Sequence, residues 1–297
     1  MNQRSSQIRE VLNRFENQPL ANDIWQILDS QQFAGYLSAQ TLNTLTERYQ
    51  LNAKSLALLF LPVAACYATT PISHFNVGAI ALDKQGNAYF GANQEFAQSN
   101  IQQSIHAEQS AISHAWMRGA TQLTDIIINY TPCGHCRQFM NELNSAATLQ
   151  IHLPHAQNNS LQQYLPDSFG PRDLQIETCL LDKTNNQLQL TSDDHLVQQA
   201  LAMANQAHAP YSQSYSGVAL ELQNGQIFGG SYAENAAFNP SLPAMQVVLN
   251  YLILSGQSVE NIKRAVMVER PTKLSGHALA KELLGVISPV PLEYHSI

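Results

Sequence analysis

Two short motifs place one imidazole and two thiols where they can share a metal ion. The sequence is H-A-E at residues 106–108 and P-C-G-H-C at residues 132–136. His106, Cys133 and Cys136 make a three-ligand set for zinc, and three protein ligands leave the fourth tetrahedral position open. An open position is typical of catalytic zinc, because it can hold a water whose pKa the ion lowers toward ~7. A fold that uses this set must bring the two segments together at one point.

Glu108 lies two residues from His106 and is not needed as a ligand, so its carboxylate is free to move protons. H-x-E followed by P-C-x-x-C is a signature of zinc-dependent nucleobase deaminases, in which the Glu is the general acid and base. A C-x-x-C pair alone also occurs in redox sites and structural zinc sites. A redox pair needs no upstream H-x-E, and a closed structural site needs a fourth ligand. His135 is poorly placed for that, because it lies between the two cysteines.

Composition argues against a nucleic-acid partner. The chain has 297 residues, enough for two domains, and 44% of them are hydrophobic, as in a soluble globular protein. Its net charge is -7, and no basic run occurs. Binding to a phosphate backbone requires clustered Lys and Arg.

No membrane partner and a cytoplasmic location are expected. The most apolar stretch, residues 56–66, is too short to span a membrane and contains Pro62. The first ten residues are polar and contain no apolar signal core. Four cysteines, two of them in the metal set, do not indicate a disulfide framework, which fits a reducing compartment. Cys66 and Cys179 are expected to be buried as small hydrophobes.

Apolar spacing and turn residues predict a mixed α/β order. Residues 1–50 are expected to be helical, from the spacing of Ile24, Ile27 and Leu28 and of Leu42 and Leu45. Further helices are expected over residues 55–68, from Ser104 as N-cap to Arg118 before Gly119, and from Pro132 onward. Strands are expected over residues 76–82, 88–91 and 125–130. His106 and Glu108 then lie near the start of one helix, and both cysteines in the first turn of the next.

The chain also contains an internal repeat. Residues 71–78 (PISHFNVG) resemble residues 210–217 (PYSQSYSG), and residues 104–109 (SIHAEQ) resemble residues 241–246 (SLPAMQ). Between these segments, Phe90-Gly91 is matched with Phe228-Gly229. At a similar offset the chemical residues are replaced, His106 by Pro243, Glu108 by Met245, Cys133 by Arg270 and Cys136 by Lys273. The repeat therefore predicts a duplicated domain whose second copy has lost its metal; chance similarity is the alternative.

With these motifs, nearly the whole chain resembles the cytidine deaminases, specifically their long, homodimeric bacterial type. The resemblance implies duplicated three-layer α/β/α domains with a small N-terminal helical segment. It divides the chain into a helical segment (1–50), a catalytic zinc domain (51–150), a linker (151–190) and a degenerate, non-catalytic repeat (191–297). It also implies one zinc per subunit, a homodimer, and hydrolysis of cytidine and 2′-deoxycytidine to uridine and 2′-deoxyuridine in pyrimidine salvage.

The resemblance also implies a nucleoside-binding segment before the zinc helix. In it, Asn93 and Glu95 would hold the ribose hydroxyls, which fits their spacing because residues i and i+2 of an extended chain point the same way. Gln94 would line the site mainly through its backbone. Ala107 and Thr131 would offer backbone groups to the base. Phe75 would pack on the pyrimidine, with ordinary core packing as the alternative, and Phe169 in the linker is a weaker candidate.

Two other classes of function remain open. A zinc deaminase acting on a base within RNA or DNA would share the motif. The acidic charge and the sugar-holding segment argue against it. A non-catalytic scaffold stabilised by zinc would have no need of Glu108.

Overall fold

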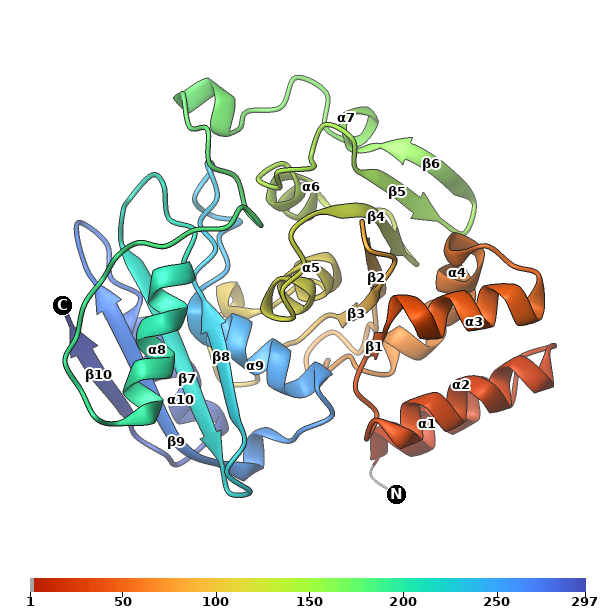
Figure 1. Ribbon diagram of the computed structural model, residues 1–297, viewed down its shortest axis with the longest axis horizontal. Coiled ribbons are helices and arrows are strands. Elements are labelled where there is room, and N and C mark those ends of the chain that lie inside the picture. The colour runs from red at the N-terminus through yellow and green to blue at the C-terminus, as the bar shows by residue number, and fades with distance from the viewer. Residues whose placement is uncertain (1–2) are drawn as a thin grey trace.

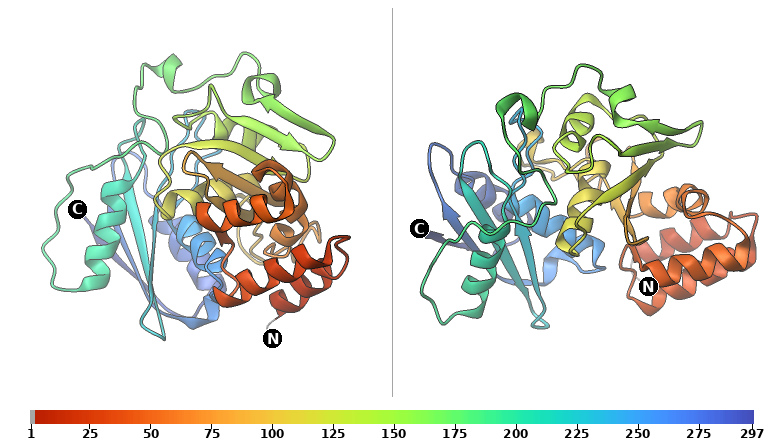
Figure 2. Two further views of the ribbon diagram at one scale, coloured as in Figure 1. Left: turned by 45° about the vertical axis from the view of Figure 1, so that its right-hand side comes forward. Right: turned by 45° about the horizontal axis from the view of Figure 1, so that its top comes forward.

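The computed structural model describes residues 3–297, and two β-sheets organise that part of the chain (Figure 1). The first sheet has the strand order β1-β3-β2-β4-β5-β6, and the second has the order β10-β9-β7-β8. Two further views show the N-terminal helices beside the first sheet and away from the second (Figure 2). The expected α/β class is therefore confirmed.

The first unit consists of six strands with helices on both faces. Its strands are β1 (Tyr36–Leu37), β2 (Gly78–Asp83), β3 (Ala88–Ala92), β4 (Leu123–Ile128), β5 (Gln150–Leu153) and β6 (Ala156–Ser160). Its helices are α1 (Gln3–Leu12), α2 (Gln18–Ser30), α3 (Ala39–Tyr49), α4 (Ala53–Ala65), α5 (Ala107–Met117), α6 (Gly134–Met140) and α7 (Leu161–Tyr164). Helix α4 packs on one face of strands β2 to β4, and α5 packs on the other.

Two glycines let these helices approach the sheet closely. A Cβ atom on Gly78 would lie 2.6 Å from backbone atoms of α4, and one on Gly91 would lie 2.2 Å from the backbone nitrogen of Ala111 in α5. Strand β2 pairs antiparallel with both β3 and β4 and is buried along its whole length. This close contact therefore fixes the distance between the sheet and α5, the helix that begins at the H-A-E motif.

The second unit repeats this plan. Its strands are β7 (Tyr215–Leu222), β8 (Ile227–Ser231), β9 (Ile262–Arg270) and β10 (Leu292–Ser296), and its helices are α8 (His195–Gln206), α9 (Ala244–Leu254) and α10 (His277–Ile287). Strand β7 pairs antiparallel with β8 and β9, and β10 runs parallel to β9, as β5 does to β4. Helix α8 packs on one face and α9 on the other. The predicted duplication is confirmed.

The structure corrects part of the expected alignment of the two copies. Gly91 is matched by Gly230 and not by Gly229, because only Gly230 faces the backbone of α9, at 2.4 Å from the nitrogen of Val248. The N-cap of α6 is Cys133, and that of α10 is Gly276, so the pairing of Cys133 with Arg270 is wrong. His106 and Pro243 remain matched as the N-caps of α5 and α9.

The two copies meet through α5 and α9 in a reciprocal way. The side-chain amide of Gln109 on α5 donates to the carbonyl of Pro240, at 2.9 Å, and that of Gln246 on α9 donates to the carbonyl of Gln103, at 2.6 Å. Each glutamine reaches the loop that precedes the other helix. Asn250 of α9 also forms buried hydrogen bonds with α5. The second copy therefore holds α5, the helix that begins at the H-A-E motif, in place through these hydrogen bonds.

Several expected boundaries moved. The helix expected from Ser104 begins at Ala107 with His106 as its N-cap, and Ser104 instead follows a short 3-10 turn. Pro132 lies before the next helix and does not open it. The linker expected from residue 151 holds β5, β6 and α7, so the first sheet continues to Ser160.

The N-terminal segment is helical as expected, except for the two-residue strand β1, which pairs with β3. Helix α4 contains Pro62 without ending there. Cys66 and Cys179 are half-buried, and not buried as expected. Within residues 3–297, no helix combines the length and the apolar character that a membrane crossing requires.

Candidate metal and nucleoside site

The three expected zinc ligands converge. Cys133 Sγ lies 3.4 Å from His106 Nδ1, Cys136 Sγ lies 3.3 Å from the same nitrogen, and the two sulfurs are 3.6 Å apart. A tetrahedral zinc ion with bonds of about 2.3 Å to sulfur and about 2.0 Å to nitrogen would separate two sulfurs by about 3.8 Å and a sulfur from a nitrogen by about 3.5 Å. The spacing and the chemistry of the donors therefore both fit zinc.

Helix starts hold the ligands in place. His106 and Cys133 are the N-caps of α5 and α6, and Cys136 lies one turn into α6. Contacts with Cys136 and then with His106 lower the pKa of the Cys133 thiol to about 3. Zinc binds the thiolate form, so Cys133 is prepared for the ion. His135 stacks on the His106 ring, with centroids 4.8 Å apart, and is not part of the ligand group.

Glu108 lies in the first turn of α5, and only 3% of it is exposed. Burial raises the pKa of its carboxyl group, and a hydrogen bond with the Cys136 thiol acts in the opposite direction. A raised pKa makes a carboxylate a stronger base, which suits a group that takes a proton from a neighbouring water. Its position beside the ligand group therefore suits an acid and base.

Asn93 and Glu95 lie in the loop after β3, where both are bonded to the loop of residues 71–77. The Asn93 amide accepts from the Val77 N–H at 2.8 Å and donates to the Phe75 carbonyl at 2.9 Å. One carboxylate oxygen of Glu95 accepts from two backbone N–H groups, at 2.9 and 3.0 Å. Burial raises the pKa of Glu95, but hydrogen bonds from the Ser73 side chain and from the two backbone N–H groups outweigh burial and hold the pKa below its ordinary value.

The same carboxylate interaction occurs in the second copy. Glu234 accepts from the backbone N–H groups of Tyr211 and Ser212, at 2.9 and 3.0 Å, as Glu95 does from Ile72 and Ser73. Because the second copy lacks the zinc ligands, this interaction is part of the fold that the two copies share. Glu95 therefore shapes the loop, whatever else it binds.

Gln94 is expected to line the site mainly through its backbone. Its backbone N–H and carbonyl both pair with Ile105, and its side chain donates to the carbonyl of Tyr67. The backbone groups expected to line the site are thus already bonded. Its side-chain Oε1 is buried without a partner among the described residues.

The remaining candidates differ in exposure. Phe75 is 50% exposed and packs on Tyr130, with ring centroids 4.7 Å apart, so ordinary core packing is excluded for it. Phe169 is also exposed, as is Thr131, and Ala107 is buried at the start of α5. Sequence reasoning missed Tyr130 as a neighbour of Phe75, and only its place two residues after the end of β4 could have indicated it.

This site and the duplicated fold define a zinc-binding deaminase. Two sequence models with the description "Cytidine and deoxycytidylate deaminase zinc-binding region" match the chain, at residues 54–152 and 161–281. A cytidine deaminase of Histophilus somni is 60% identical over 98% of this chain and 96% of its own length. One of Pasteurella multocida is 55% identical over 98% of this chain and 99% of its own.

The chain belongs to the cytidine deaminase family. A crystal structure of a cytidine deaminase from Burkholderia pseudomallei covers 39% of this chain and 98% of its own, with 28% identity and a TM-score of 0.35.

Proposed function

We propose that this chain hydrolyses cytidine and 2′-deoxycytidine to uridine and 2′-deoxyuridine, releasing ammonia. The observation that carries the proposal is the convergence of His106, Cys133 and Cys136 beside buried Glu108, in a member of the cytidine deaminase family. Zinc held by the three ligands would supply a water of lowered pKa at its open position. The two thiols must stay reduced to bind it, so we assign the reaction to a reducing compartment such as the cytoplasm.

Glu108 carries the proton transfers. Its carboxylate accepts a proton from the water whose oxygen attacks C4 of the pyrimidine ring. It gives this proton to N3, then takes the remaining proton of the water from the hydroxyl now bonded to C4 and gives it to the amino group, which leaves as ammonia when its bond to C4 breaks. One water is consumed and one ammonia released, so the atoms balance. Burial supports this role, because it raises the pKa of the carboxyl group and so makes the carboxylate a stronger base.

Asn93 and Glu95 would orient the sugar, with Phe75 against the base and Ala107 at the base edge. Asn93 can offer its second amide hydrogen, because the loop takes only one of the two, and the Glu95 carboxylate has acceptor positions beyond its hydrogen bonds with the loop. Gln94 would act by holding the loop against Ile105.

The net charge of -7 favours a free nucleoside as the substrate over a base within a nucleic acid. The deciding assay follows ultraviolet absorbance with cytidine, 2′-deoxycytidine and a cytosine-containing oligonucleotide in parallel. We expect loss of both nucleosides and no change in the oligonucleotide. Turnover of the oligonucleotide alone would establish a deaminase that acts on a base within RNA or DNA. If a zinc-loaded chain turned over none of the three substrates, the chain would be a non-catalytic scaffold.

The expected homodimer is part of the proposal. Exposed aromatic side chains support it, namely Phe75, Tyr130, Phe169 and Phe238. Light scattering should give about twice the chain mass of 32.8 kDa. A monomeric mass at working concentration would contradict the dimer.

We expect Glu95→Gln to lower kcat/KM for cytidine by roughly tenfold to a hundredfold, because a hydrogen bond to a charged group is worth roughly 1.5–3 kcal/mol. The matched control is Glu234→Gln, which weakens the same two loop hydrogen bonds in the second copy. If both variants lost the same small amount of activity, Glu95 would be a loop residue only. Zinc content should be normal in both variants.

A further inference from the structure

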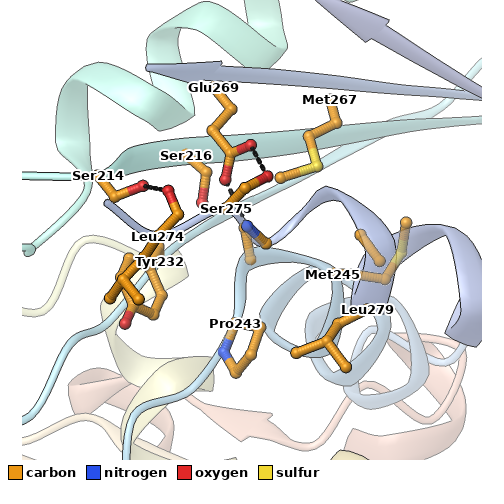
Figure 3. Close-up of a pocket in the computed structure, with 13 residues that line it drawn as sticks. Ser214, Ser216, Tyr232, Pro243, Met245, Met267, Glu269, Leu274, Ser275 and Leu279 are labelled. Atoms are coloured by element: carbon orange, nitrogen blue, oxygen red, sulfur yellow. Dashed lines mark hydrogen bonds between the residues drawn. The ribbon is translucent and has the colours of Figure 1, made fainter. Parts of the chain in front are cut away.

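A cavity of about 210 Å³ lies in the second copy, where the first copy has its metal site. Pro243 and Met245 on its wall occupy the helix positions of His106 and Glu108, and Gly276 and Leu279 occupy those of Cys133 and Cys136. The chemistry has been lost, but the space has not been filled. Figure 3 shows side chains from β9, α9 and the loop before α10 around it.

The cavity wall is mostly apolar and carries no positive charge. Its apolar side chains are Tyr232, Pro243, Ala244, Met245, Met267, Leu274, Leu279 and Ala280. No Lys, Arg or His lines it among the described residues, so a phosphate or another anion would find no partner. An engineered apolar cavity of about 150 Å³ holds one benzene ring. The available space therefore suits a single neutral ring with small substituents.

Two polar groups on the wall can hold such a ring. Glu269 is 1% exposed, and its carboxylate accepts from the Gly276 N–H, the Ser275 hydroxyl and the Tyr294 hydroxyl. A carboxylate has about four acceptor positions, so one remains for an N–H donor of a ligand. Ser216 is 4% exposed, and its hydroxyl has no hydrogen-bond partner among the described residues. It can therefore donate to a carbonyl.

We propose that this cavity is a second, non-catalytic site that binds one neutral pyrimidine ring through Glu269, Ser216 and the apolar wall. A pyrimidine base offers a flat ring, an N–H donor and a carbonyl acceptor, which match the wall. The choice of pyrimidines among neutral rings rests on the proposed function, because that reaction brings them to the protein. The inert copy would then sense the substrates or products of the active one.

The test locates and measures binding in the full chain. Crystals soaked with 5-bromouracil should show anomalous scattering from bromine between Tyr232 and Met245. Calorimetry with uracil on a Cys136→Ala chain, which lacks one of the three metal ligands of the first site, should still show binding, and adding Ala280→Leu to the same chain should remove it. Bromine found only in the first copy, or no heat from the Cys136→Ala chain, would overturn the proposal.

Variants assign the binding to the cavity. Ser216→Ala should weaken uracil binding by roughly threefold to tenfold, the effect of one neutral hydrogen bond, with an unchanged melting temperature. Ala280→Leu should abolish binding by filling the cavity, while Ala278→Leu makes the same change on the exposed side of α10 as a control. Equal affinity in all three would refute the site. Cytidine turnover is measured separately, so turnover without second-site binding would refute this proposal alone, and the reverse would refute the proposed reaction alone.

Discussion

Glu108→Gln should lower kcat for cytidine by roughly 10²–10⁴-fold or more, because one positioned acid and base contributes about that much and this residue serves several proton transfers. Glutamine keeps the size and polarity of the side chain but cannot accept or return a proton. The variant should be folded and should bind zinc as the parent chain does, since Glu108 is not a ligand. The measurement is the loss of cytidine absorbance, with zinc content determined on the same sample.

Near-normal turnover by a zinc-loaded Glu108→Gln chain would refute the role proposed for this carboxylate. Loss of zinc together with activity would instead show that Glu108 supports the metal site. These two results are distinguishable, because the metal is measured independently of the reaction.

Gly91→Ala should impair both stability and activity. The added Cβ would lie 2.2 Å from the backbone nitrogen of Ala111 and 2.5 Å from the carbonyl oxygen of Ala107, and neither is a flexible side chain. Overpacking of this kind costs about 1–3 kcal/mol of unfolding free energy. Because α5 must move, His106 and Glu108 move with it, and a misplacement of about 1 Å can cost about 10²-fold in rate. Urea denaturation and the cytidine assay measure the two effects.

Gly230→Ala is the matched control. Its Cβ would lie 2.4 Å from the Val248 nitrogen and 2.6 Å from the Ala244 oxygen, so the same clash arises against α9. We expect a similar loss of stability but a smaller loss of activity, because α9 carries no zinc ligand and acts on α5 only through its hydrogen bonds with α5 and the segment before it. If Gly91→Ala and Gly230→Ala had equal activity, the distance between α5 and the sheet would not determine the rate of the reaction.

The convergence of the zinc ligands could be predicted from the sequence, because few arrangements of His, Glu and two Cys suit that chemistry. The duplication was also predictable, because residues 71–78 resemble residues 210–217. The structure agrees, since Gly78 and Gly217 at the ends of these segments both meet the backbone of a helix. Finer alignment was not predictable from residue likeness. Phe90-Gly91 resembles Phe228-Gly229, yet the close contact with a helix falls on Gly230.

Interactions with backbone groups also escaped prediction. The sequence indicated that Asn93 and Glu95 point toward one ligand, but not that both are bonded to the loop of residues 71–77. Likewise, a constant offset between the two copies pairs Cys133 with Arg270. The connection from the sheet to the next helix is longer in the second copy, and the sequence alone does not show this. The structure puts Gly276 at the position of Cys133. Strand β1 has only two residues, and β6 (AQNNS) is polar after its first residue, so neither shows an alternating pattern.

The measurement that tests this account most directly is the zinc content of the purified full chain. We expect one zinc per chain, and none in Cys136→Ala, because the first copy holds the described ligand group and the second has Pro243, Gly276 and Leu279 at the corresponding positions. One ion lost on that substitution, together with cytidine turnover, would agree with the account. Two zinc ions per chain, or one that persists in Cys136→Ala, would contradict it.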